Sequence, residues 1–197
     1  MSVLTPDIAT ARAALARRLA PASLAHSERV EATARDLATR FGTNADEAAL
    51  AGLLHDWSRD QTAVALLEFA QRAGLAVCDV DREVPYLLHA SVAAAQVRDA
   101  FPGIAPAVVD AIASHTVGHS DMTDLMRIVY VADMIEPART FHGVAGLREL
   151  AGVQGTSLKE LFFACYRRSL LHIIEAGRRI HPDTVRVWNS LLEEADA

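Results

Sequence analysis

Apolar residues recur along most of the chain at every third or fourth position, the spacing that places them on one face of an amphipathic helix. Between about Ala22 and Phe41 this spacing produces an apolar stripe that ends before Gly42. Alternating runs of β-branched residues do not occur, and alanine is abundant, which favours helices over strands. The pattern therefore predicts an all-α fold.

Cap residues, glycines and prolines mark where the helices are expected to begin and end. Pro6 is expected at the first position of the N-terminal helix. Asn44 and Ser157 each begin a sequence typical of a capping box. Prolines at positions 106 and 182 should begin two more helices. After the first, helices are expected over approximately residues 22–41, 45–57, 60–74, 88–101, 106–117, 122–136, 147–150, 158–177 and 182–192.

Two helix starts rest on acidic or hydroxyl residues alone. Asp60 is expected to cap the helix that runs to Gly74, and Ser120 or Asp121 is expected to cap the helix that ends before Pro137. Residues 75–87, which include Cys78, Asp79, Asp81 and Pro85, are expected to form a variable connection.

No repeat, low-complexity run or linker divides the chain. Its 197 residues are enough for one sizeable core. We therefore expect a single domain over residues 1–197, with an N-terminal helix in 1–20 and a core in 21–192.

Composition excludes several classes of protein. Hydrophobic residues make up 51% and charged residues 22%, as in folded globular proteins. A formal net charge of -6 argues against a nucleic-acid partner, although bound cations would still allow a small phosphorylated substrate. No stretch approaches the roughly 18 apolar residues of a membrane span. The two cysteines are far apart and form no CxxC, so a cytoplasmic location is expected.

Metal-type side chains recur at points where a helix is expected to end or to present its inner face. His55 and Asp56 directly follow an apolar run, where a carboxylate beside an imidazole is costly to bury unless both bind a cation. One inward histidine alone is more often an ordinary core residue. A complete ordered series is much harder to explain by coincidence. The series is His26, His55, Asp56, His89, His115 and Asp133.

Four imidazoles and two carboxylates are more ligands than one metal ion usually needs. Two ions that share Asp56 as a bridge would use the whole set. A two-metal site lowers the pKa of a bridging water and holds phosphoryl oxygens during in-line attack. The series therefore favours hydrolysis of a phosphate ester or anhydride, with Fe, Mn, Zn or Co all allowed by the ligand types.

The short sequence motifs around these residues indicate which known family the chain resembles. They are His26-Ser27, Ala51-Gly52-Leu53-Leu54-His55-Asp56-Trp57, His115-Thr116-Val117-Gly118, Val131-Ala132-Asp133-Met134-Ile135-Glu136-Pro137-Ala138-Arg139 and Ile180-His181-Pro182-Asp183-Thr184. In an all-helical chain of this length, they resemble the HD-domain superfamily of metal-dependent phosphohydrolases. Within it they are most similar to the YqeK family of symmetrical bis(5'-nucleosyl)-tetraphosphatases, from about Leu19 to Leu192.

This resemblance implies an HD-domain helical bundle with a di-iron site that splits diadenosine tetraphosphate into two ADP. Carried over by position, the metal ligands would be His26, His55, Asp56, His89, His115 and Asp133, with Asp56 as the bridge. The expected partner is this small nucleotide, and the oligomeric state is left open.

Phosphate charge also requires hydrogen-bond donors. Arg59 lies three residues after Asp56, Arg139 follows the helix of Asp133, and both offer a planar fork for phosphate. Thr116 can donate its hydroxyl. His181 is expected either to contact a base or ribose or to cap the helix that begins at Pro182. The expected catalytic residues are thus Asp56, Arg59, Thr116 and Arg139, and the expected substrate contacts are Arg59, His89, Thr116, Asp133, Arg139 and His181.

Three alternatives stay open. One is an HD-type nucleotide phosphatase with one metal that acts on mono- or diphosphates, and another is a non-catalytic nucleotide sensor. The third is a helical scaffold with incidental histidines. Residues expected outside the site, in packing, loop or surface positions, are Trp57, Tyr86, His119, His142, Cys165 and His172.

Overall fold

The computed structural model describes residues 6–196, with side chains described as far as Glu193. That range contains helices and no strand, which confirms the all-α expectation. The elements are α1 (Ile8–Leu15), α2 (Pro21–Phe41), α3 (Ala45–Leu54), α4 (Ala63–Arg72), α5 (Asp79–Glu83), the 3-10 helix η1 (Pro85–Leu88), α6 (His89–Ala100), α7 (Pro106–Ser114), α8 (Asp124–Ile135), α9 (Val144–Gly152), α10 (Leu158–Glu175) and α11 (Pro182–Asp196).

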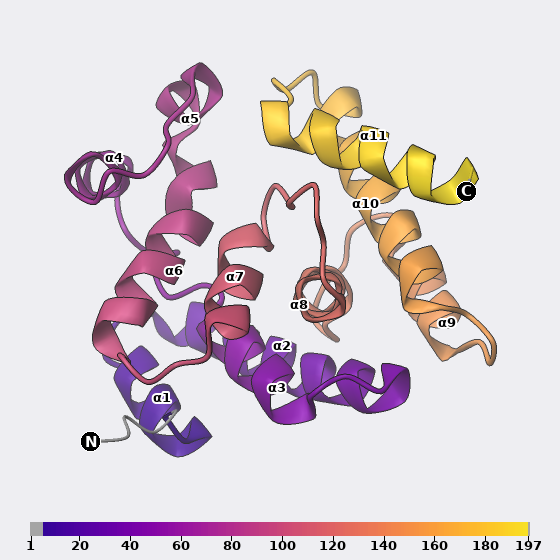
Figure 1. The fold of residues 1–197 in the computed structure, drawn as a ribbon, viewed down its shortest axis with the longest axis horizontal. Helices are drawn as coiled ribbons and strands as arrows, with labels where there is room; N and C mark the ends of the chain where they lie inside the picture. Colours follow the sequence, from indigo (N-terminus) through magenta and orange to yellow (C-terminus); the bar gives the residue numbers. More distant parts are fainter. Residues whose placement is uncertain (1–5, 197) are drawn as a thin grey trace.

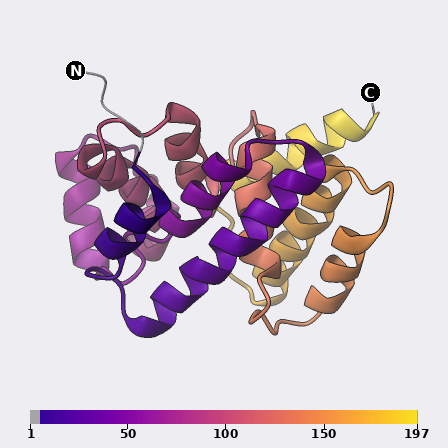
Figure 2. The ribbon, with the colours of Figure 1, turned by 90° about the horizontal axis from the view of Figure 1, so that it is seen from below.

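Helix α8 lies near the middle of the fold and is seen almost end-on in Figure 1. It packs against α2, α3, α7 and α10. Helices α1 and α11 lie at opposite ends of the molecule (Figures 1 and 2). One hydrophobic cluster runs from Ala11 in α1 to Leu191 in α11, and a smaller one lies beneath α4. Among the described helices, none combines the length and the apolar character that a bilayer span requires.

Helices α2 and α3 approach each other closely at Gly52. A Cβ atom at this position would lie 3.0 Å from the carbonyl oxygen of Val30 and 3.1 Å from the Cβ of Ala34. Only glycine fits without displacing the backbone of α2. The close packing brings the imidazole of His26, in α2, within 5.3 Å of that of His55 at the end of α3, measured between ring centroids.

Several predicted helix ends are confirmed. Gly42 ends α2 with a φ of 72°, and Pro182 begins α11. The Asn44 side chain accepts hydrogen bonds from two backbone N–H groups of α3. Ser157 and Glu160 form the reciprocal capping box at the start of α10.

Three predicted helix starts are wrong. Pro6 precedes the first helix, because the Asp7 carboxylate caps it by accepting from Thr10 N–H at 2.7 Å. Asp60 does not cap α4. Its carboxylate instead accepts from Ala20 N–H and the Ser23 hydroxyl, at 2.7 and 2.8 Å, and so holds the start of α2.

Threonines cap α4 and α8 in place of the expected residues. Thr62 caps α4 by accepting from Ala65 N–H, and Thr123 caps α8 by accepting from Met126 N–H. Neither Ser120 nor Asp121 caps α8. The stretch expected as a variable connection, 75–87, contains the short helix α5 and most of η1.

Candidate metal centre

The structure brings the six side chains of the predicted series together around Asp56. Five of them are buried, and the side chain of Asp133 is 20% exposed. The Oδ2 atom of Asp56 lies 3.2 Å from His55 Nε2 and 3.5 Å from His26 Nε2. Asp133 Oδ1 completes this group at 2.9 Å from His26 Nε2.

The other carboxylate oxygen of Asp56 faces a second group. Its Oδ1 atom lies 3.3 Å from His89 Nε2 and 3.7 Å from His115 Nε2. The two Nε2 atoms are 3.0 Å apart. The donors thus form two sets, one at each oxygen of Asp56, as a carboxylate shared by two cations would require.

Three of the four histidines are oriented by a carbonyl group in the last turn of the helix before them. His55, His89 and His115 directly follow the last residues of α3, η1 and α7. Each Nδ1 donates to the carbonyl three residues earlier. The acceptors are Gly52 at 2.7 Å, Tyr86 at 2.6 Å and Ile112 at 2.7 Å.

A proton held on Nδ1 leaves the lone pair on Nε2. Every one of these Nε2 atoms points toward Asp56. The backbone therefore fixes both the tautomer and the direction of the lone pair, as supporting hydrogen bonds do at metal-binding histidines.

His26 is oriented by a side chain that the sequence analysis left without a role. Its Nδ1 donates to Glu136 Oε1 at 3.1 Å. Glu136 is 2% exposed and also accepts from Arg29 Nε at 2.6 Å and from Ala138 N–H at 2.7 Å. The position of Glu136 three residues after Asp133, about one helical turn, was the feature of the sequence that indicated a place beside the centre.

Two buried atoms in the centre, His55 Nε2 and Asp56 Oδ1, have no hydrogen-bond partner among the residues that the structure describes. Buried polar atoms left in this state are costly, and a cation that accepts both lone pairs would remove that cost. Imidazole and carboxylate donors suit first-row transition metals. The residues present therefore fit divalent metal ions.

Electrostatics keep both aspartates ionised. Burial alone would raise the pKa of the Asp56 carboxyl, but interactions with the imidazoles of His55, His115 and His89 hold it well below its usual range. Burial likewise opposes ionisation of Asp133, yet the imidazole of His26 and the guanidinium of Arg139 beside it lower its pKa. Both aspartates can therefore offer anionic oxygens to a cation.

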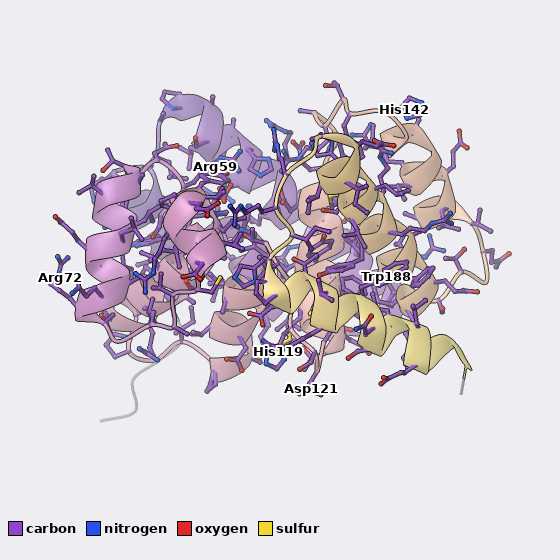
Figure 3. All side chains as sticks on the ribbon, turned by 90° about the horizontal axis from the view of Figure 1, so that it is seen from above. Arg59, Arg72, His119, Asp121, His142 and Trp188 are labelled. Carbon is purple, nitrogen blue, oxygen red and sulfur yellow. The ribbon has the colours of Figure 1, made fainter. Side chains whose placement is uncertain are left out.

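The two arginines that were expected to bind phosphate pair with the same carboxylates. Arg59 donates to Asp56 Oδ2 at 2.5 Å, and Arg139 donates to Asp133 Oδ1 and, at 2.9 Å, to the carbonyl of Asp133. Both side chains are 30% exposed. In Figure 3, Arg59 lies well away from Arg72, which is at the edge of the molecule. Because Arg59 and Arg139 contact the carboxylates and are also partly exposed, their guanidinium groups can reach both the centre and its opening.

A cavity of about 170 Å³ opens beside Asp56, and its lining includes residues of both donor groups, among them His89 and Asp133. Thr116 lies on its wall, with its hydroxyl 3.2 Å from His115 Nε2 and 3.4 Å from His89 Nε2. Tyr86, expected to be a packing residue, lines this cavity. Its ring stacks on His89 with 4.5 Å between centroids, and the residue is 45% exposed. The position of Tyr86 three residues before His89 was the feature of the sequence that indicated a place beside the centre.

The lining of that cavity does not include His181. Its Nδ1 instead accepts from Asp183 N–H at 3.1 Å, so of the two roles left open it takes the capping one at the start of α11. Its contact with a nucleoside stays a prediction. His119, His142 and His172 are exposed, and Figure 3 shows His119 and His142 at the periphery. Trp57 and Cys165 are buried in the core, where burial raises the pKa of the Cys165 thiol to about 12.

Comparison with known proteins agrees with this geometry. The HD domain family model matches residues 23–138. A crystal structure of a predicted HD superfamily hydrolase involved in NAD metabolism, from Clostridium acetobutylicum, superimposes with a TM-score of 0.88 at 28% identity, over 96% of this chain and 99% of that one. The chain therefore belongs to the HD-domain family of hydrolases.

Within that family, the chain is similar to curated proteins named bis(5'-nucleosyl)-tetraphosphatase, symmetrical. The protein from Bacillus subtilis strain 168 is 31% identical over 85% of this chain and 88% of its own length. The protein from Halalkalibacterium halodurans is 33% identical, over 86% and 88%. That from Staphylococcus aureus is 30% identical, over 83% and 84%. The resemblance seen in the sequence is thus confirmed.

Proposed function

We propose that this chain hydrolyses diadenosine tetraphosphate and related dinucleoside tetraphosphates symmetrically, with ADP as the sole nucleotide product of the former. The observation that carries the proposal is the arrangement of four Nε2 lone pairs and Asp133 Oδ1 around the two oxygens of Asp56. The names of the three curated relatives support the choice of substrate.

The reaction would add water to the β-phosphorus and break its bond to the central bridging oxygen, which leaves with ADP. Two bound divalent ions would lower the pKa of the attacking water and offset charge on the phosphoryl oxygens. Arg59 and Arg139 would turn from the carboxylates of Asp56 and Asp133 toward the phosphate chain and bind it through paired N–H donors. Thr116 would donate its hydroxyl to a phosphoryl oxygen.

The size of the cavity sets where the substrate lies. About 170 Å³ accommodates ions, water and a phosphoryl group, but it is smaller than the roughly 300–1,000 Å³ of pockets that enclose whole ligands. The nucleosides would therefore extend beyond it, past the exposed ring of Tyr86. We propose that this ring stacks on one nucleobase.

We propose iron as the native metal, with manganese, cobalt or zinc able to replace it. The donors of the centre are imidazole nitrogens and carboxylate oxygens, without a thiolate, which suits iron and manganese at least as well as zinc. The cytoplasmic location expected from the two cysteines likewise stays a proposal.

The test is product identification after the chain, loaded anaerobically with Fe²⁺, is incubated with diadenosine tetraphosphate. ADP alone is expected. AMP with ATP would overturn the symmetrical assignment, and no turnover with Fe²⁺, Mn²⁺ or Co²⁺ would overturn the enzyme proposal in favour of a nucleotide sensor.

Parallel reactions separate the remaining alternatives. AMP, ADP and ATP as substrates test a phosphatase that acts on single nucleotides. NAD tests hydrolysis of another dinucleotide anhydride, because the similar structure from Clostridium acetobutylicum is of a protein involved in NAD metabolism. Faster turnover of any of these than of diadenosine tetraphosphate would replace the proposed substrate.

A further inference from the structure

A second group of potential metal ligands lies away from Asp56. It consists of Cys78, Asp81 and His181, which we call the outer cluster. Cys78 and Asp81 belong to the start of α5, and His181 immediately precedes α11. The beginning of α11 faces α5 in Figure 1, although the two segments are about a hundred residues apart in the sequence.

The three donor atoms are close enough to share one ion. His181 Nε2 lies 3.3 Å from Cys78 Sγ and 3.3 Å from Asp81 Oδ1. All three donors lie within 4.8 Å of one another. Bonds of about 2.0–2.3 Å at tetrahedral angles place neighbouring ligand atoms roughly 3.3–3.6 Å apart. Both distances from His181 Nε2 therefore match the edges of a tetrahedral site, and the third pair of donors lies within 4.8 Å.

The outer cluster is open on one side. Its three residues line a cavity of about 570 Å³, whose lining includes none of the six ligands around Asp56. Asp81 is 5% exposed, whereas Cys78 and His181 are half-buried. Three protein ligands with an open fourth position is the arrangement that leaves room for water or an added ligand on zinc.

The neighbouring arginines leave the Asp81 carboxylate to the cluster. Arg82 pairs with Asp79, and Arg179 pairs with Glu83 at 2.6 Å. Asp81 Oδ2 accepts from Cys78 N–H at 2.9 Å, which fixes the carboxylate and leaves Oδ1 directed at His181. An ionised Cys78 thiol and Asp81 would together carry the two negative charges that a divalent cation neutralises.

Metal binding requires two proton movements. His181 Nδ1 now accepts from Asp183 N–H, so the ring proton lies on Nε2. On binding, this proton would move to Nδ1, which would give up its hydrogen bond from Asp183 N–H and donate instead to the Asp183 carboxylate, 3.7 Å away. A carboxylate behind the imidazole is the usual support of a metal-bound histidine. The Cys78 thiol would lose its proton to solvent.

We propose that the outer cluster binds one Zn²⁺-type transition-metal ion through Cys78 Sγ, Asp81 Oδ1 and His181 Nε2, with the fourth position open to the cavity. Thiolate and imidazole ligands select such ions over magnesium or calcium. The site would join α5 to the start of α11. It is independent of the hydrolysis proposed above.

Cobalt substitution tests the site without any measurement of activity. Co²⁺ bound to a thiolate gives a sulfur-to-metal charge-transfer band in the near ultraviolet, and the donors around Asp56 include no sulfur. The intact chain titrated with Co²⁺ should show this band. Cys78→Ser should abolish it, Asp81→Asn should weaken Co²⁺ binding about tenfold or more, and Cys165→Ala should retain it.

A second measurement uses the unaltered chain. Saturating Zn²⁺ should slow alkylation of Cys78 by iodoacetamide about tenfold or more, because coordination occupies the thiolate, while the buried Cys165 reports any unfolding. A chain without the charge-transfer band, a band that persists in Cys78→Ser, or alkylation of Cys78 at the same rate with and without Zn²⁺ would each overturn the proposal. In that case the cluster is a hydrogen-bonded link between α5 and α11 only.

Discussion

The centre around Asp56 and the outer cluster hold similar side chains in opposite states. In the centre, each histidine donates a hydrogen bond from Nδ1, to a carbonyl or to Glu136, so the Nε2 lone pair is already directed inward. In the outer cluster, His181 accepts at Nδ1 and keeps its proton on Nε2. The first is organised for a cation before one arrives, whereas the second must change tautomer.

The charged neighbours of the two sites also differ. Asp56 is fully buried and is paired with Arg59, while Asp133 is paired with Arg139. Two arginine side chains thus lie where metal ions would bring positive charge. In the outer cluster, the imidazole of His181 is the partner of Asp81. The hydrogen-bond partner of a histidine's second nitrogen, more than the set of ligand residues, therefore separates a prepared metal site from an optional one.

Replacement of the shared carboxylate should have the largest effect. Asp56→Asn removes the anionic oxygens that face both donor sets, and we expect turnover of diadenosine tetraphosphate to fall about a thousandfold or more, or roughly 4 kcal/mol in the activation free energy. The matched control is Asp46→Asn, because the Asp46 side chain is 88% exposed. Turnover of the Asp56 variant within tenfold of the unaltered chain would contradict a bridging role.

Metal should stabilise the chain mainly through the centre. At about 1,000 times its Kd, Mn²⁺ is expected to add roughly 4 kcal/mol and raise the Tm by about 8–16 °C. Differential scanning fluorimetry should show this increase in Cys78→Ser but not in Asp56→Asn. A Tm increase that is lost in Cys78→Ser but kept in Asp56→Asn would mean that metal stabilises the chain mainly through the outer cluster.

Glu136 tests whether the partner of a histidine matters as much as the comparison implies. Glu136→Gln keeps the shape of the side chain but removes the charge that holds His26 and Arg29, so we expect metal affinity or turnover to fall about 10- to 100-fold. Glu68→Gln, at an exposed position in α4, is the matched control. Equal metal affinity of the two variants, measured by calorimetry, would show that His26 needs no such partner.

Gly52 tests the packing that brings two ligands together. A Cβ atom 3.0 Å from the Val30 carbonyl should lower the free energy of unfolding of Gly52→Ala by about 1–3 kcal/mol. The control, Gly146→Ala in α9, adds a Cβ with nothing within 4 Å and should stabilise by roughly 0.5–1 kcal/mol. Urea denaturation measures both. Equal stability changes would mean that α2 and α3 can move apart freely at this point.

Sequence alone predicted most of the helices and the six side chains that gather around Asp56. The reason is local: His55 and His115 directly follow helices whose apolar pattern is clear, and the order of the series matches a known family. Where several capping residues lie close together, as at Asp60 and Thr62 or Asp121 and Thr123, sequence could not choose among them. The choice depends on tertiary contacts, such as those of Asp60 with the start of α2.

Contacts between distant segments were the other limit. Glu136 and Tyr86 stood beside predicted ligands, but their roles depend on which neighbour they face after folding. The outer cluster joins α5, which the sequence pattern did not predict, to a segment about a hundred residues later. Only the packing of α5 near α11 reveals it.

Anomalous diffraction from crystals of the Mn²⁺-loaded chain tests the central claim most directly. We predict two anomalous peaks, one beside each oxygen of Asp56, the first within reach of His26, His55 and Asp133 and the second within reach of His89 and His115. A single peak, or peaks that do not contact Asp56, would contradict a pair of ions held by this carboxylate.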